Sequence, residues 1–147
     1  MTKDFFPECS ESDWQIMPMV AGRSFDAKMG PFEFRKTAEG KAQARFKTDD
    51  DCRNIQYGLH GGYLAACAEQ AFYLPLYTDR CVALGRVVTI DFNMQFLQGG
   101  DIGKDLIADI ELMKETGRMG FTRGTLSQGG QALCSFSATL RKLPPQA

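Results

Sequence analysis

From residue 31 onward, apolar and polar residues alternate in segment after segment, and this two-residue period constrains the fold more than any other feature. Such alternation is typical of β-strands that bury one face of a sheet. It predicts six strands whose apolar side chains stand at even positions, around 32–35, 41–47, 88–96, 105–112, 118–128 and 131–141. Glycine-containing turns separate the last four segments and favour an antiparallel meander.

One segment of a different character separates the second and third predicted strands. Residues 60–76 are rich in Ala and Leu, begin with two glycines after a histidine and contain Pro75 near their end, which predicts one helix of about four turns. The helix surface is apolar nearly all round, as expected when a sheet encloses a helix. We therefore predict an α+β hotdog fold, in which a long, curved antiparallel sheet wraps around one central helix.

A length of 147 residues suits a single compact domain. We divide the chain into an N-terminal segment at 1–25, a hotdog domain at 26–143 and a short tail at 144–147. The pattern from Ser10 to Met17 allows a short helix in the N-terminal segment, because Pro18 discourages its continuation.

Charge and cysteine content exclude several other classes of protein. Seventeen Lys and Arg against eighteen Asp and Glu give a formal net charge of −1, which provides no global field for nucleic acid or an anionic membrane. We expect a cytoplasmic protein, because the N-terminus lacks a secretory signal and the weakly polar stretch 58–77 falls short of a membrane span. Five cysteines without a C-x-x-C pair argue against a disulfide framework and a zinc site.

The predicted helix carries a carboxylate, Glu69, among apolar residues, and its burial is costly unless it is partnered or used. The loop before the helix contains Asn54, the only histidine, His60, and the pair Gly61 and Gly62. Backbone N–H groups at a glycine-rich helix N-terminus suit a developing oxyanion. From the residues alone, two alternatives stay open: Glu69 lies on a solvated or subunit-facing stripe, and the glycines are ordinary turn residues.

The motif N-x-x-x-G-x-H-G-G, which begins at Asn54 and is followed by an acidic residue nine positions after the histidine, resembles the hotdog acyl-CoA thioesterases of the phenylacetate-pathway and 4-hydroxybenzoyl-CoA type. This resemblance implies hydrolysis of an acyl-CoA thioester without a metal or redox cofactor. In that family, Glu69 would correspond to the nucleophile or general base, and Asn54 to the amide that positions the substrate or water. The Gly61 N–H would polarise the thioester carbonyl, and His60 would help to hold the loop.

The resemblance adds further candidates for substrate binding, including Gly62 beside the oxyanion loop. Thr89 stands where family members often carry a Ser or Thr near the reacting centre, and Tyr73 stands where several carry Thr or Ser, so we expect Tyr73 to line an acyl pocket. From the residues alone, an ordinary strand position for Thr89 and a core position for Tyr73 remain alternatives to substrate binding. The candidates for binding the phosphates of coenzyme A are Lys114, Arg118 and Arg123. The alternative is that these three residues are solvated charges at the edge of the sheet.

Helix geometry gives an argument that does not depend on the resemblance. At about 1.5 Å per residue, Gly61 and Glu69 are about 12 Å apart along one helix, too far for both to contact one thioester carbon. Two antiparallel helices would bring Glu69 of one chain to Gly61 and Asn54 of another, so we predict a homodimer with two shared sites. The family often doubles this dimer into a tetramer.

Two other functions remain alternatives to hydrolysis of an acyl-CoA. A hydroxyacyl-CoA dehydratase on the same fold would use a His and a Glu in one site. In a non-catalytic acyl-CoA binding module, Glu69 would serve only as a polar partner at an interface between subunits. The identity of the acyl group is not specified by the sequence.

Overall fold

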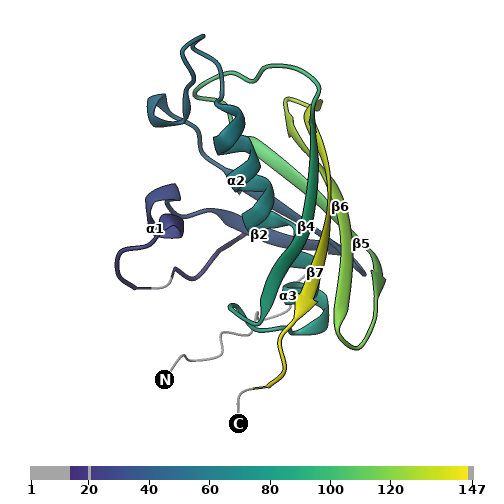
Figure 1. Ribbon diagram of the computed structural model, residues 1–147. Coiled ribbons are helices and arrows are strands. Elements are labelled where there is room, and N and C mark those ends of the chain that lie inside the picture. The colour runs from purple at the N-terminus through teal and green to yellow at the C-terminus, as the bar shows by residue number, and fades with distance from the viewer. Residues whose placement is uncertain (1–13, 20, 146–147) are drawn as a thin grey trace.

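The computed structural model describes residues 14–19 and 21–145, and in this part of the chain seven strands form one antiparallel sheet (Figure 1). The sheet order is β1-β2-β3-β5-β6-β7-β4. The strands are β1 (Gln15–Ile16), β2 (Glu33–Ala38), β3 (Lys41–Phe46), β4 (Val87–Phe96), β5 (Leu106–Glu115), β6 (Met119–Gln128) and β7 (Gln131–Lys142). The helices are α1 (Phe25–Met29), α2 (Gly61–Ala71) and α3 (Leu74–Arg80), and a short 3-10 turn covers Asp50–Cys52.

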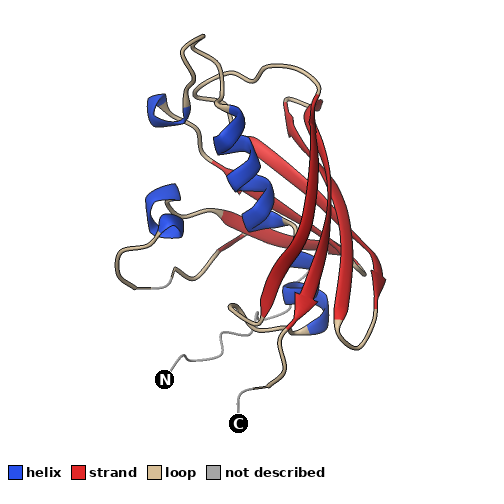
Figure 2. Ribbon diagram, viewed as in Figure 1, coloured by secondary structure: helices blue, strands red, loops and turns tan. Residues whose placement is uncertain are grey.

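The curved sheet wraps around α2, as the hotdog prediction requires (Figure 2). The helix buries a stripe of side chains at positions i, i+3, i+4 and i+7, namely Leu64, Cys67, Ala68 and Ala71. It packs against β3 and β5, where Ala44 and Ala108 are fully buried. These small side chains let the helix approach the sheet closely, so the enclosed core is dense around α2.

The predicted helix over residues 60–76 is wrong in its extent, because the chain forms two helices there. α2 ends at Ala71, and α3 begins at Leu74 with Pro75 in its first turn. Proline has no N–H to donate to the carbonyl four residues earlier, and its ring clashes with that carbonyl, but the first turn of a new helix tolerates it. The break places Tyr73 at the N-cap of α3.

The predicted meander of the last four strands is wrong for β4. β5, β6 and β7 pair in sequence order, but β4 pairs with β7, from Val87 opposite Lys142 to Phe96 opposite Cys134. Gly99 and Gly100, which we expected in a hairpin turn, lie in the longer connection that carries the chain to β5. β4 is therefore an edge of the sheet, and among the described residues no strand pairs with its outer side.

The N-terminal segment contains a strand where the sequence predicted a short helix. Gln15 and Ile16 form β1 beside β2, and the rest of that prediction, residues 10–13, lies outside the described residues. α1 follows, and the hydroxyl of Ser24 caps it by accepting the Ala27 N–H at 3.0 Å. Within the described chain, no helix is long and apolar enough to cross a membrane.

The close packing of the sheet interior predicts a large effect for Gly124→Ala. A Cβ at this position would lie 2.2 Å from the Asp109 carbonyl oxygen and 2.6 Å from the Phe136 ring. We expect a loss of about 2 to 3 kcal/mol in the free energy of unfolding, measured by urea denaturation. Gly117→Ala is the matched control, because a Cβ there has no neighbour within 4 Å. Equal stability of the two variants would contradict the prediction.

Candidate active site

Asn54 organises the loop that leads into α2. Its side-chain oxygen accepts the backbone N–H groups of Gln56 at 2.8 Å and Gly58 at 3.0 Å, and its backbone N–H donates to the Gly58 carbonyl at 2.8 Å. These bonds are typical of an Asx turn. The side-chain nitrogen makes only one long contact, 3.5 Å to the Leu59 carbonyl. Asn54 therefore shapes the loop and keeps donor capacity on its nitrogen, which carries two N–H bonds.

His60 caps the N-terminus of α2. Its Nδ1 accepts the Gly62 N–H at 2.8 Å, and its backbone N–H donates to the Cys52 carbonyl at 2.8 Å. Because Nδ1 accepts a bond, the proton of a neutral imidazole resides on Nε2. The Gly62 N–H is thus occupied by His60. The Gly61 N–H, in contrast, has no hydrogen bond to any described residue, and it lies at the positive end of the helix dipole.

Two residues that the sequence analysis did not single out anchor this loop to the sheet connection. The Leu59 N–H donates to the Gly100 carbonyl at 3.1 Å, and a Cβ at Gly100 would lie 2.8 Å from the Leu59 side chain. Gln128 holds the same connection, because its side chain accepts the Asp101 N–H at 2.8 Å and donates to the Asp101 and Lys104 carbonyls. Gly100 was visible in the sequence only as a turn residue.

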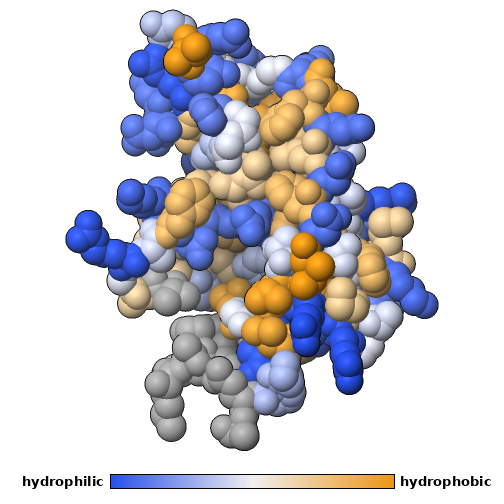
Figure 3. Space-filling view, viewed as in Figure 1, coloured by the Kyte–Doolittle hydropathy of each residue, from blue (hydrophilic) through white to orange (hydrophobic). Residues whose placement is uncertain are grey.

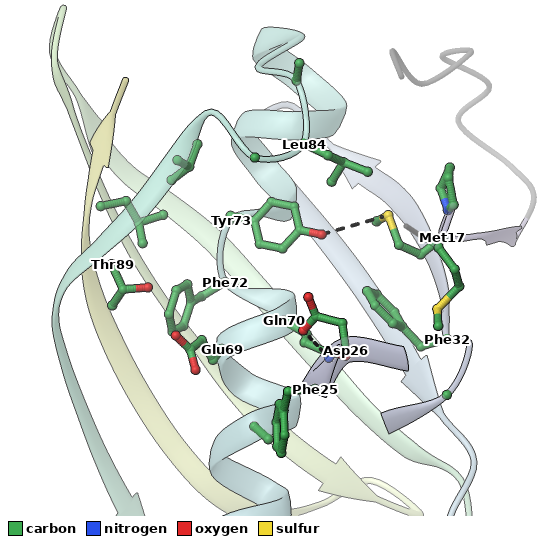
Figure 4. Close-up of a pocket in the computed structure, with 18 residues that line it drawn as sticks. Met17, Phe25, Asp26, Phe32, Glu69, Gln70, Phe72, Tyr73, Leu84 and Thr89 are labelled. Atoms are coloured by element: carbon green, nitrogen blue, oxygen red, sulfur yellow. Dashed lines mark hydrogen bonds between the residues drawn. The ribbon is translucent and has the colours of Figure 1, made fainter. Parts of the chain in front are cut away.

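Glu69, Tyr73 and Thr89 line one pocket of about 400 Å³ beside the open side of α2 (Figure 4). Figure 4 shows the Glu69 carboxylate directed toward β4, where the Thr89 hydroxyl lies. Much of the pocket wall is apolar, with contributions from Met17, Phe32, Phe72, Leu84, Val87 and Leu140. The pocket thus combines the Glu69 carboxylate and the hydroxyl groups of Tyr73 and Thr89 with a surface suited to hydrocarbon.

The structure divides the predicted catalytic residues into two groups. Asn54, His60 and Gly61 lie at the N-terminal end of α2, and they do not line the pocket that contains Glu69. A Cβ at Gly61 would lie 3.3 Å from the ring of Phe96, at the end of β4. One chain therefore holds both halves of the candidate site but does not bring them to a common point.

The three basic residues proposed for the phosphates of coenzyme A lie elsewhere. Lys114 is the penultimate residue of β5, Arg118 is in the following turn and Arg123 is on β6, and none of them lines the pocket. Arg123 is paired with Glu111 at 3.3 Å. Among the described residues, Lys114 and Arg118 have no ion pair. The described chain also contains no group of three His, Cys, Asp or Glu side chains that could hold a metal ion.

α1 contributes pocket residues that the sequence analysis missed. Phe25 and Asp26 face α2, and Asp26 accepts a hydrogen bond from Gln70 at 3.2 Å. The local signals for this short helix are its Ser24 cap, the acidic residue in its first turn, and the basic residue and glycine at its end. Those signals predict where the helix begins and ends but do not predict what the helix covers.

Residues 48–141 match the family model described as the acyl-CoA thioesterase N-terminal domain. The chain belongs to this family. The predicted resemblance to hotdog thioesterases is therefore confirmed, and so is the prediction of an enzyme that hydrolyses acyl-CoA thioesters.

Known members and solved structures agree with this assignment. Human acyl-coenzyme A thioesterase 13 is 24% identical over 107 residues, which are 73% of this chain and 75% of that protein. The phenylacetic acid degradation protein PaaI of Thermus thermophilus, solved as a point mutant, is 24% identical with a TM-score of 0.69, over 81% of this chain and 98% of that chain. A hypothetical thioesterase of Streptococcus pneumoniae, solved with coenzyme A, has a TM-score of 0.67 at 19% identity, over 79% and 91% of the two chains. These structures confirm the hotdog fold of the thioesterase.

The cap on α2 predicts that His60→Ala destabilises the thioesterase. Loss of the acceptor for the Gly62 N–H should lower the free energy of unfolding by about 1 kcal/mol in urea denaturation. His60→Asn is the matched variant, because an Asn side chain can cap the same N–H and should retain most of the stability. Equal losses in both variants would show that the imidazole cap does not stabilise the helix.

Proposed function

We propose that this thioesterase is a homodimer with two shared sites, in which Glu69 of one subunit and the Gly61 N–H of the other act on one acyl-CoA. The main support for the proposal is that the two halves of the candidate site lie at different places along α2. The pocket with Glu69 lies on one side of the helix, and the unpaired Gly61 N–H lies at its N-terminus. Eight residues of helix correspond to about 12 Å, so one chain cannot place both groups on one carbonyl.

β4 supports assembly through the edge of the sheet. Val88, Ile90 and Phe96 on this strand are 40%, 56% and 57% exposed, and Figure 3 shows apolar surface gathered over the strand. An unpaired strand edge with apolar side chains is suited to pairing with another strand. In a two-fold dimer the two β4 edges would pair and the two α2 helices would lie antiparallel. A tetramer would form if two such dimers associate.

In the proposed reaction, the thioester carbonyl oxygen accepts the Gly61 N–H of one subunit, and negative charge develops on that oxygen. The Glu69 carboxylate of the other subunit either attacks the carbonyl carbon directly or takes a proton from a water that attacks it. Direct attack gives a mixed anhydride, which water then hydrolyses. In both routes the C–S bond breaks, the acid is released and coenzyme A leaves as the thiol after protonation.

The remaining residues position these groups. Asn54 has donor capacity left on Nδ2, which could hold the carbonyl or the water, and His60 fixes the loop through the Gly62 N–H. Thr89 lies beside Glu69 in the pocket and is suited to hold the attacking water. The proposed reaction uses no cofactor, because coenzyme A enters as part of the substrate. The streptococcal hypothetical thioesterase solved with coenzyme A supports the choice of an acyl-CoA as substrate. Lys114, Arg118 and Arg123 stay candidates for its phosphates.

The dehydratase alternative has weaker support. That reaction would require the His60 imidazole to exchange a proton with the substrate beside Glu69 of the other subunit, but its Nδ1 is bonded to the Gly62 N–H, so the ring acts as the cap of α2. A pure binding module would not need a carboxylate beside the Thr89 hydroxyl. Thioester hydrolysis therefore accounts for more of the geometry than either alternative.

The role of Glu69 predicts that Glu69→Gln lowers kcat by about 10² to 10⁴-fold, with a much smaller change in KM. The substitution keeps the shape and the hydrogen-bonding capacity but removes the charge, so a purely structural role predicts near-normal turnover. Release of free thiol from acyl-CoA measures the rate. Glu39→Gln is the control, because Glu39 is 85% exposed and outside the pocket. Turnover of Glu69→Gln within threefold of wild type, about 0.7 kcal/mol, would remove this residue from the mechanism.

The role of the Gly61 N–H predicts a difference between Gly61→Pro and Gly61→Ala. Gly61 is the first residue of α2, and the extended backbone of His60 at φ −69° and ψ 133° is compatible with a following proline. Gly61→Pro should therefore fold but lose about 10²-fold or more in kcat, because it lacks the N–H. Gly61→Ala adds the same Cβ beside Phe96 while it keeps the N–H, so its loss should be much smaller. Equal losses would assign the effect to the Cβ.

Mixing inactive Glu69→Gln and Gly61→Pro subunits tests whether the sites are shared. Each hybrid dimer would contain one intact site, so a fully exchanged equal mixture should recover about a quarter of wild-type activity. Size-exclusion chromatography with light scattering establishes the assembly, and differently tagged subunits establish the exchange. No recovery after confirmed exchange would show that each site belongs to one chain.

A further inference from the structure

A β-bulge at Ile90 decides which side chains of β4 face the pocket. β4 pairs with β7 in two registers, which meet between Thr89 and Asp91, and Ile90 is the extra residue without an opposite residue on β7. Because side chains alternate along a strand, the extra residue exchanges the two faces. Thr89 therefore faces inward, opposite the fully buried Leu140, although its position is odd. Beyond the bulge the even positions face inward, as far as Phe96.

The two ends of β4 belong to the two halves of the candidate site. Thr89, near the start of the strand, lines the pocket that contains Glu69. At the other end, the exposed ring of Phe96 lies beside Gly61, where a Cβ would be 3.3 Å from it. In the proposed dimer, Glu69 of one subunit meets the Gly61 N–H of the other. The start of one β4 must therefore lie opposite the end of the other β4.

Antiparallel pairing restricts the possible registers of two β4 edges. Residues opposite each other on neighbouring strands point to the same face of the sheet. A two-fold axis between two residues would place an inward side chain opposite an outward one, so the axis must pass through a residue. An axis through Asp91 is unfavourable, because it would place two carboxylates opposite each other. The central candidates that remain are Phe92, Asn93 and Met94.

We propose that the two β4 strands of the dimer pair antiparallel with Asn93 on the two-fold axis. The proposal rests on the shared sites proposed above and specifies the strand contacts that would build them. Counting from Asn93, Asp91 of one subunit stands opposite Gln95 of the partner subunit. At the next position Phe96 stands opposite Thr89 of the partner subunit, because the bulge removes one residue from the count and both side chains face inward.

The neighbouring registers do not align the two ends of the strands. An axis through Phe92 would place Met94 opposite Thr89 of the partner subunit and leave Phe96 two residues beyond it. An axis through Met94 would place Phe96 opposite Phe92 of the partner subunit, two residues short of Thr89. Two residues correspond to about 7 Å along a strand, more than a hydrogen bond can span. Only the axis through Asn93 brings both ends together.

The polar side chains of β4 agree with this register. Asp91, Asn93 and Gln95 are exposed, and none of these three side chains has a hydrogen-bond partner among the described residues. In the proposed register the Gln95 amide can donate to the Asp91 carboxylate of the partner subunit. The two Asn93 amides can pair with each other across the axis. All three side chains thus gain partners, and no like charges come together.

Cysteine cross-linking in the whole chain tests the register. The background carries Cys9→Ser and Cys81→Ser and keeps the three buried cysteines. Under mild oxidation Asn93→Cys should form an intermolecular disulfide, because opposite Cα atoms are about 4.5 to 5.5 Å apart, within the range that a disulfide spans. Asp91→Cys and Gln95→Cys are matched controls on the same face.

In each control the two copies of the cysteine would lie about 14 Å apart along the strands. Asn93→Cys should therefore cross-link at least about tenfold faster than either control alone. A mixture of Asp91→Cys and Gln95→Cys subunits, after confirmed exchange, should cross-link as readily as Asn93→Cys. Non-reducing electrophoresis measures the rates. The oxidised Asn93→Cys dimer should release thiol from acyl-CoA within about threefold of the reduced protein, because the disulfide fixes the proposed pairing.

The cross-linking pattern separates the register from the proposed function. Faster coupling of Asp91→Cys with Asn93→Cys than with Gln95→Cys would place the axis at Phe92 and overturn the proposal. So would a dimer in light scattering in which none of these cysteines cross-links, because its interface would lie elsewhere. If no acyl-CoA is hydrolysed, the proposed function fails, but the cross-linking pattern still tests the register. A monomeric chain would overturn both.

Discussion

The packing of α2 in the hollow of the sheet is the constraint on which the rest of the structure depends. The stripe formed by Leu64, Cys67, Ala68 and Ala71 is in contact with the sheet, so the chemistry of the helix is confined to its open side and its N-terminus. Glu69 and Gln70 project from that open side into the pocket, and Gly61 starts the helix. A helix that presents one buried face thus separates the Glu69 carboxylate from the proposed oxyanion donor, the Gly61 N–H, by about 12 Å along its axis.

Close approach between the elements depends on small residues in the sheet and on the break after α2. A Cβ at Gly120 would lie 2.9 Å from the Leu76 side chain, so the glycine makes room for α3 against β6. α3 can take this position because Pro75 ends the path of α2 and starts a new helix. The same break leaves Tyr73 at the pocket. The position of Tyr73 at the pocket and the packing of α3 therefore have a common origin in the sequence around Pro75.

Local patterns in the sequence were sufficient to locate strands β2 to β7 and the start of the enclosed helix, because each depends on residues close together in the chain. The alternation in residues 88–96 located β4 correctly, but periodicity does not say which strand is the neighbour, and β4 pairs with β7. Pro75 predicted an end to the helix, although the same residue is also compatible with a new first turn. Asp26 was missed because α1 has five residues and buries none, which leaves no periodic signal. The cluster of Lys114, Arg118 and Arg123 was visible, but its distance from the pocket depends on the fold of the whole sheet.

The edge strand connects assembly to chemistry in the proposed dimer. Val88 and Ile90 expose apolar surface on the same strand that carries Thr89 in the Glu69 pocket, and a Cβ at Gly61 would meet the Phe96 ring at the other end of this strand. Pairing of this strand with a second copy would bury that surface and fix both ends of the strand at once. The groups that flank the two halves of the site would then be held by the interface itself. An isolated subunit would retain its fold around α2 but would have neither a covered edge nor a complete site. Covering the exposed edge and completing the proposed site thus both depend on the same ten residues of β4.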